Sequence, residues 1–238
     1  MPLASNASIR SASGDGTRGR HIGTSAKPAQ RGNGTTRDPE RTKASILSAA
    51  TREFTEKGFG GARVDNIARR AKINKRMLYH YFGGKELLYV AVLEESYAAI
   101  RSAEGALDLG HRAPRDAMQE LVLFTWHYYL DHPEFLSLLG TENLMRGKFV
   151  KRSQRAQIMN SPIIAALDDV LGRGAKTGVF KPGLDPLDVY LTIAGLGFFY
   201  LSNRYTLTAA FGRDLMDKAE LARWGDHIVD VVLTHLTP

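Results

Sequence analysis

The chain has 238 residues, 43% hydrophobic and 24% charged, a composition ordinary for a folded globular protein of one or two domains. It has no cysteine, which excludes disulfides, thiolate metal sites and cysteine nucleophiles, and no histidine pair with metal-ligand spacing. The first 90 residues contain 17 Lys and Arg against 7 Asp and Glu (+10), whereas the rest contain 15 against 18 (−3), which is typical of a polyanion-binding end or of a solvated basic surface.

Residues 1–38 are rich in Ser, Gly, Thr, Ala and Arg and contain few large apolar side chains. Such a segment cannot bury enough surface to offset the entropy of ordering, so we expect a disordered basic tail. The first residues lack the apolar core of a signal peptide, and the longest near-apolar run (Val189 to Leu201) is too short to span a bilayer. The sequence therefore predicts a cytoplasmic protein that makes no membrane contact.

Four helices with short connections are predicted over residues 39–106. Asp38 is a suitable cap for a helix that begins at Pro39 and ends at Gly58. Two short helices follow, one from about 63 to 71 and one from the cap Asn74 to residue 82. A longer helix is expected after Gly84.

Helical periodicity continues to the end of the chain, with no sustained period-two alternation. We therefore predict an all-α fold. The further helices are expected over 114–131, 135–145, 149–172 with a break near Ser161-Pro162, 185–210, and from Asp214 to about Leu236, with a loop over 178–183.

The two short helices predict a helix-turn-helix unit. A helix of about eight residues is marginal alone, so both must pack on each other and on the preceding helix. On a helical wheel, Leu78 and Phe82 point inward, while Arg76 and His80 point outward. Lys75 and Arg76 lie in the first turn, where each cation opposes the helix dipole by about 0.3–1 kcal/mol. A bound polyanion would compensate this unfavourable placement of two cations. The major groove of DNA is wide enough to admit such a helix, so the arrangement favours DNA binding by this face.

The start of the next helix is a second candidate contact. Free backbone N–H groups after Gly84, together with the Lys85 ammonium, could clamp a phosphate. An ordinary exposed lysine is the alternative interpretation.

Three short motifs mark this region: Ile67-Ala68-x-x-Ala71, Leu78-Tyr79-x-x-Phe82 and Lys85-Glu86-x-Leu88, with Phe54 and Gly58-Phe59 ahead of them. On these residues, over about fifty positions, the sequence resembles the DNA-binding domain of the TetR family of transcriptional regulators. It implies a three-helix DNA-binding domain with a helix-turn-helix over 39–88 and a larger helical effector-binding and dimerisation domain over 89–238. One departure is Lys72, at a turn position where the family usually has glycine, so either this lysine takes a positive φ or the turn differs.

The resemblance also implies phosphate contacts by Tyr79, Tyr81 and Lys85, and contact with bases by residues 75–77. Together with the helical wheel, it gives a set of expected DNA-binding residues. These are Arg63, Asn66, Lys75, Arg76, Met77, Tyr79, His80, Tyr81 and Lys85.

In the larger domain, the resemblance implies a homodimer formed through the last two helices and a small-molecule effector bound among the middle helices. Apolar stripes on both of the last two helices suit such pairing, although they could equally serve the core of one chain. Polar or aromatic side chains on otherwise apolar helices are candidate pocket residues, with core packing as the alternative role for each. They are Trp126, Tyr129, Glu142, Asn143, Phe198 and Asn203.

The function expected from these features is sequence-specific, non-enzymatic transcriptional regulation: a repressor released from a palindromic, double-stranded DNA operator by a small molecule, without a cofactor or metal. A constitutive DNA-binding protein without an effector is the main alternative. An enzyme fused to a DNA-binding module is disfavoured because the sequence has no nucleophile elbow and no glycine-rich phosphate loop.

Overall fold

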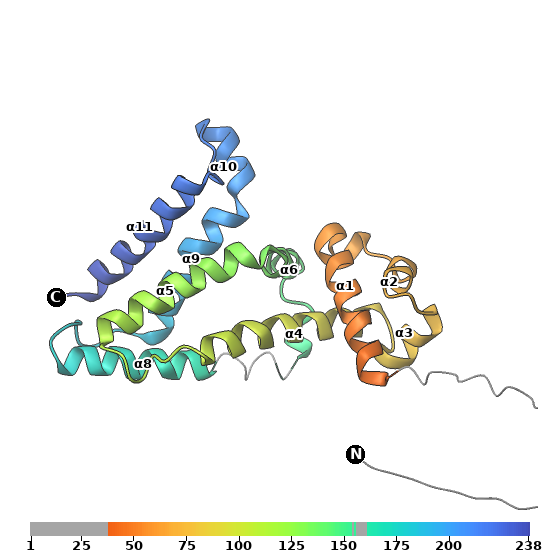
Figure 1. Cartoon of the computed structure of the whole chain (residues 1–238), viewed down its shortest axis with the longest axis horizontal. Helices are drawn as coiled ribbons and strands as arrows, with labels where there is room; N and C mark the ends of the chain where they lie inside the picture. The colour runs from red at the N-terminus through yellow and green to blue at the C-terminus, as the bar shows by residue number, and fades with distance from the viewer. Residues whose placement is uncertain (1–37, 154, 156–160) are drawn as a thin grey trace, which may run out of the picture. The chain divides into compact units, whose positions relative to one another are not determined.

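The computed structural model describes residues 38–153, 155 and 161–238, and the predicted disordered tail lies outside this part except for Asp38. The described residues form helices and turns with no strand, which confirms the all-α prediction (Figure 1). The elements are α1 (Pro39–Gly61), α2 (Val64–Arg70), α3 (Lys75–Phe82), α4 (Lys85–Gly105), α5 (Pro114–Asp131), α6 (Pro133–Leu144), the 3-10 turn η1 (Val150–Arg152), α8 (Ser161–Lys176), α9 (Pro186–Ser202), α10 (Arg204–Phe211) and α11 (Lys218–Leu236).

The predicted start of the first helix is confirmed by its capping contact. The Asp38 carboxylate accepts a hydrogen bond from the Glu40 backbone N–H at 3.0 Å, and Pro39 occupies the first helical position. Gly58 has a φ of 63° and interrupts α1, whose last turn continues to Gly61. Gly83, in the left-handed region, ends α3.

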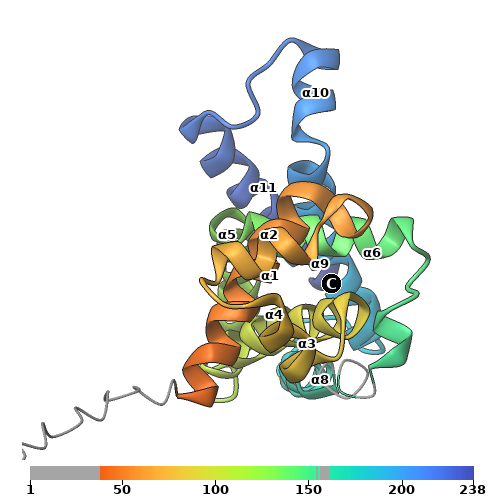
Figure 2. The ribbon, with the colours of Figure 1, turned by 90° about the vertical axis from the view of Figure 1, so that its right-hand side faces the viewer.

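Two hydrophobic clusters hold the helices together. The first contains residues of the four helices α1, α2, α3 and α4. Its fully buried members include Ile46, Phe54, Ile67 and Leu78. The second fills the space between α5, α8, α9 and α11, and α5 contacts each of the other three helices (Figure 1). The view in Figure 2 has α1, α2 and α3 at the front. α4 contributes to both clusters, so it connects the helix-turn-helix to the larger set of helices.

Glycines allow close helix contacts in the second cluster. A Cβ atom added at Gly197 would lie 3.2 Å from the Tyr129 ring, and one added at Gly225 would lie 3.0 Å from the Trp126 ring. Another helix therefore approaches α9 closely at Gly197, whereas Gly195 is exposed and a Cβ atom added there would meet nothing within 4 Å.

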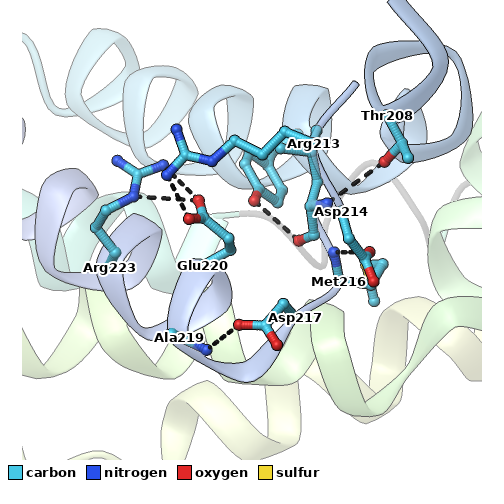
Figure 3. Close-up of polar contacts among 10 residues, drawn as sticks. Thr208, Arg213, Asp214, Met216, Asp217, Ala219, Glu220 and Arg223 are labelled. Atoms are coloured by element: carbon cyan, nitrogen blue, oxygen red, sulfur yellow. Dashed lines mark hydrogen bonds and ion pairs between the residues drawn. The ribbon is translucent and has the colours of Figure 1, made fainter. Parts of the chain in front are cut away.

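The predicted single helix over 185–210 is wrong, because the chain breaks into α9 and α10 at Asn203. The predicted start of the last helix at Asp214 is also wrong. Asp214 accepts from the Met216 N–H within a turn, and the cap of α11 is Asp217, which accepts from the Ala219 N–H (Figure 3). The turn is fixed by the Tyr200 hydroxyl, which donates to the Leu215 carbonyl at 2.9 Å.

The helix predicted from Phe149 is wrong in its first residues. The Glu142 carboxylate accepts from the backbone N–H groups of Phe149 at 2.6 Å and Val150 at 2.9 Å, which fixes a 3-10 turn there instead. Residues 154 and 156–160 lie outside the described part, and α8 begins at Ser161.

Among the described residues, no helix has the length and apolar character needed to cross a membrane. The same residues contain no group of three or more His, Asp or Glu side chains placed to hold a metal ion.

Candidate nucleic-acid interface

α2 and α3 form a helix-turn-helix held by a short hydrogen-bonded turn. The Ile73 N–H donates to the Ala68 carbonyl at 3.0 Å, and the Asn74 side chain accepts from the Arg76 N–H at 2.9 Å. Beneath α3, Leu78 is fully buried, and Ile73 and Phe82 pack partly buried against the same cluster. The predicted inward face of α3 is therefore confirmed.

The turn takes an uncommon backbone conformation at Lys72, which has a φ of 54°. This is the left-handed region, where a side chain with a Cβ is disfavoured. The sequence left open whether Lys72 takes a positive φ or the turn differs, and the structure has the positive φ.

The opposite face of α3 is exposed and carries cationic and aromatic groups. Lys75, Arg76, Tyr79 and His80 are exposed, with Tyr79 at 46% of its full accessibility. The first turn of α3 contains no acidic residue to offset the two cations there. This face can therefore present donors to a polyanion in a groove.

Two of the expected residues lie partly inside. Met77 is half-buried, and Tyr81 packs partly against the hydrophobic cluster while its ring lies edge-on to His80. Only part of the Tyr81 side chain therefore faces solvent.

Lys75 already has an anionic partner within the domain. Its Nζ lies 2.8 Å from Asp65 Oδ1 on α2, and this contact raises the pKa of Lys75. Both side chains are exposed, so solvent screens the attraction between them, and a phosphate could displace the carboxylate at small cost.

Lys85 lies at the start of α4 beside a second cation. Its ammonium sits 4.7 Å from the centre of the Phe59 ring. Partial burial, together with the positive charge of nearby Arg63, lowers the pKa of Lys85. Two cations next to the free N–H groups of a helix start favour an anion at this place.

Sequence reasoning missed the buried carboxylate of Glu53, which is 1% exposed. Its Oε1 accepts from the Asn66 side-chain amide at 2.9 Å and from the Arg63 N–H, and its Oε2 lies 3.3 Å from Arg70 Nε. Asn66 also accepts from Arg69, so its side chain is bonded within the domain. Glu53 thus fixes the start of α2, and the only sequence signal was an acid on an otherwise apolar helix face.

A second missed feature links α4 to the segment after α6. Glu86 Oε2 accepts from Arg152 at 2.7 Å, and its Oε1 lies 3.4 Å from Lys148 Nζ. Phe149 is fully buried in the first hydrophobic cluster, with ring centres 4.5 Å from Phe59 and 5.1 Å from Tyr89. α1 and α4 are therefore packed against a segment that lies beyond the expected boundary at residue 88.

The candidate pocket residues do not gather around one point. Trp126 and Tyr129 are buried in the second cluster, whereas Glu142 is bonded to the 3-10 turn. The Asn143 and Asn203 amides each donate to a carbonyl four residues earlier in the chain, and Phe198 is partly buried against the second cluster. Their role in ligand binding stays a prediction.

Two family comparisons cover most of the described chain. Residues 46–92 match the family described as "Bacterial regulatory proteins, tetR family", and residues 114–232 match "Tetracyclin repressor-like, C-terminal domain".

Individual relatives agree with these matches. The chain is 41% identical to the HTH-type transcriptional repressor NicS of Pseudomonas putida over 197 residues, covering 83% of this chain and 93% of NicS. It is 39% identical to the HTH-type transcriptional repressor SCO4008 of Streptomyces coelicolor over 113 residues, covering 47% of this chain and 54% of that protein. The structure of the transcriptional regulator SCO4942 from S. coelicolor superposes with a TM-score of 0.62 at 24% identity, covering 82% of this chain and 98% of that one, which shows a shared fold.

Proposed function

The chain belongs to the TetR family of DNA-binding transcriptional regulators, and on this premise we propose that it is a repressor released from a palindromic operator by a small-molecule effector. The family is non-enzymatic, as the sequence predicts. Repression is supported by the similarity to NicS and SCO4008, both transcriptional repressors, with which the chain shares 41% and 39% identity. Operator symmetry, effector release and a cytoplasmic location are further parts of the proposal.

One observation carries the DNA-binding part of the proposal: α3 exposes a cationic face, and its opposite face is buried against the first hydrophobic cluster. Leu78 and the Asn74 cap hold the helix, while Arg76 is exposed at its first turn. A side chain on a rigid element can reach a base edge with little loss of conformational freedom on binding. We assign base contact to Lys75, Arg76 and Met77, and phosphate contact to Tyr79 and Lys85.

The dimer interface is proposed at α9. Leu187, Leu191, Gly195 and Phe199 recur every four residues on one exposed stripe of this helix, and the two leucines and Phe199 are 49–60% exposed. On α11, Ile228, Val232 and Leu236 of the predicted stripe are buried within the same chain and Val231 is half-buried, so we place the centre of the pairing on α9. An apolar helix stripe with no partner in its own chain is suited to packing on its copy.

The dimer proposal is tested by sedimentation of Leu191→Glu. A charge in the centre of the stripe should convert the protein to a monomer. Leu144→Glu is the matched control, because Leu144 is 87% exposed on α6 outside the stripe and its replacement should leave the dimer intact. A dimeric Leu191→Glu protein would overturn this assignment.

DNA recognition is tested by selection from a random duplex pool with the full chain. A dimer should enrich two inverted half-sites whose centres lie about 10 bp apart or a multiple of it. Lys85→Ala should weaken binding to all sequences alike and reduce the slope of log K against log salt by about one. Lys176→Ala, at an exposed lysine on α8, should change neither.

Release of the selected DNA by small molecules separates the two candidate functions. An effector-responsive repressor loses affinity with at least one compound of a metabolite panel, whereas a constitutive DNA-binding protein keeps its affinity throughout.

A further inference from the structure

A run of cations follows α6 in a part of the chain that is otherwise acidic. Residues 146–155 contain five Lys and Arg and no Asp or Glu, whereas the rest of residues 91–238 contain ten Lys and Arg against 18 Asp and Glu. We call residues 146–152, which include η1, the basic loop. Cations clustered on an acidic body create a local positive potential that attracts anions.

Contacts within the chain fix the backbone of the basic loop. Arg146 has a φ of 58° and turns the chain after α6. The Glu142 carboxylate holds the N–H groups at the start of η1, and the Phe149 ring is buried. Just beyond the loop, the Ser153 hydroxyl donates to the Glu94 carboxylate on α4 at 2.5 Å. The loop therefore presents its cations on a backbone that has little freedom left to lose on binding.

The basic loop lies against α4, the helix whose start is expected to hold a DNA phosphate (Figure 1). Two of its cations contact Glu86, the residue that follows Lys85. The Lys148 ammonium lies 4.9 Å from the centre of the Phe149 ring, and this ring contacts Phe59, on which the Lys85 ammonium sits. The loop thus continues the cationic surface at Lys85 onto the larger domain.

The cations of the loop are available to a further anion. The side chains of Arg146 and Lys151 are exposed, and neither makes a hydrogen bond or an ion pair with another described residue. Lys148 and Arg152 are 53% and 52% exposed despite their contact with Glu86. Because ion pairs at a surface are weak, a phosphate competes with this carboxylate for both cations.

The position of the loop favours the DNA backbone over other anions. A duplex held at Lys85 is already beside the loop, so a second contact to the same duplex is made at a high effective concentration. Contacts from Lys and Arg to phosphates add affinity and carry no information about the base sequence.

We propose that the basic loop is a second DNA-contacting surface, and that Arg146 and Lys151 bind backbone phosphates of the operator next to the phosphate held by Lys85. The proposal rests on the DNA-binding function above and gives the larger domain a direct part in DNA affinity. None of the DNA-binding residues expected from the sequence belongs to this loop.

The test compares two double variants of the full chain that have the same net charge. Arg146→Ala/Lys151→Ala removes the two cations of the loop that have no partner. Lys176→Ala/Lys218→Ala is the matched control, because these lysines are exposed on α8 and α11 and make no ion pair with a described residue. Fluorescence anisotropy measures the affinity of each protein for the selected operator between about 50 and 200 mM salt.

The loop variant should reduce the slope of log K against log salt by about two, one for each phosphate contact, and bind at least about 10-fold less tightly at about 0.1 M salt. It should select the same bases as the original chain from a random duplex pool, because phosphate contacts do not specify bases. The control should keep the slope and the affinity of the original chain.

Arg146→Lys/Lys151→Arg keeps both charges and should keep the slope, which separates the loss of charge from a change in the loop, and circular dichroism checks that each variant folds. A loop variant with the slope and affinity of the control would overturn this proposal alone, since the original chain would still bind its operator. A loop variant that loses base preference would contradict the assignment to phosphates. If the original chain bound no DNA, the proposed function itself would fail.

Discussion

Replacing Lys72 by glycine should stabilise the protein. Lys72 is held at a φ of 54° in the turn between α2 and α3, where the Ile73 N–H closes a hydrogen bond to Ala68. Its side chain is exposed, so the substitution removes no buried contact. Glycine adopts this conformation without the steric clash that a Cβ atom introduces.

The expected gain is the difference between two effects. A residue with a Cβ in the left-handed region costs about 1–2 kcal/mol relative to glycine. Glycine also has more conformational freedom in the unfolded chain, which lowers the free energy of unfolding by about 0.4–1 kcal/mol. The free energy of unfolding of Lys72→Gly should therefore rise by about 1 kcal/mol, which corresponds to a melting temperature about 2–4 °C higher in a chain of this size.

Urea and thermal unfolding, followed by circular dichroism, measure this gain. Lys72→Ala is the matched control, because it removes the same charge but keeps the Cβ atom, and it should be no more stable than the original chain. Both variants should bind operator DNA equally. A glycine variant no more stable than the alanine variant would refute the assignment of strain to this turn.

Three further predictions follow from buried groups. Glu104→Gln should become more stable relative to the original chain as pH rises from about 4.5 to about 7. A buried carboxyl whose pKa is raised in the folded state lowers the free energy of unfolding once it ionises, here by up to about 3 kcal/mol. Urea unfolding at several pH values measures the difference in stability between the two proteins, and a difference that stays constant with pH would contradict this prediction. Glu53→Ala should lower the free energy of unfolding by about 2–4 kcal/mol by leaving the Asn66 amide and the Arg63 N–H without their acceptor, as urea titration would show, with exposed Glu40→Ala as a neutral control. Phe149→Ala should cost about 3–5 kcal/mol and lower operator affinity, whereas exposed Phe211→Ala should do neither.

Features set by neighbouring residues could be predicted from the sequence. Asp38 and Asn74 cap α1 and α3, as predicted from their positions just before each helix. The inward face of α3 was predicted from the spacing of Leu78 and Phe82. These features depend on contacts within one or two helical turns, which the local sequence specifies.

Features set by distant residues could not be predicted. Nothing near Asp214 in sequence distinguishes it as a cap from Asp217, and the choice depends on Tyr200 bonding to the intervening turn. The sequence predicts a helix that starts at Phe149. In the structure the Phe149 N–H donates to the Glu142 carboxylate, and the Phe149 ring packs in the cluster around Phe59. The Arg101–Glu104 pair resembles an ordinary surface pair at i, i+3, and only the packing of α5, α6 and α9 shows that it is buried.

The most direct test of the central claim, that the outer face of α3 reads the operator, compares the bases selected by two proteins from the same random duplex pool. Relative to the original chain, Arg76→Ala should lose base preference at one position in each half-site and bind its best site about 5- to 150-fold less tightly, the range expected for one bidentate base contact. Lys176→Ala in the same experiment controls for the loss of a surface charge. An Arg76→Ala protein that selects the original site with undiminished affinity and preference would contradict the account.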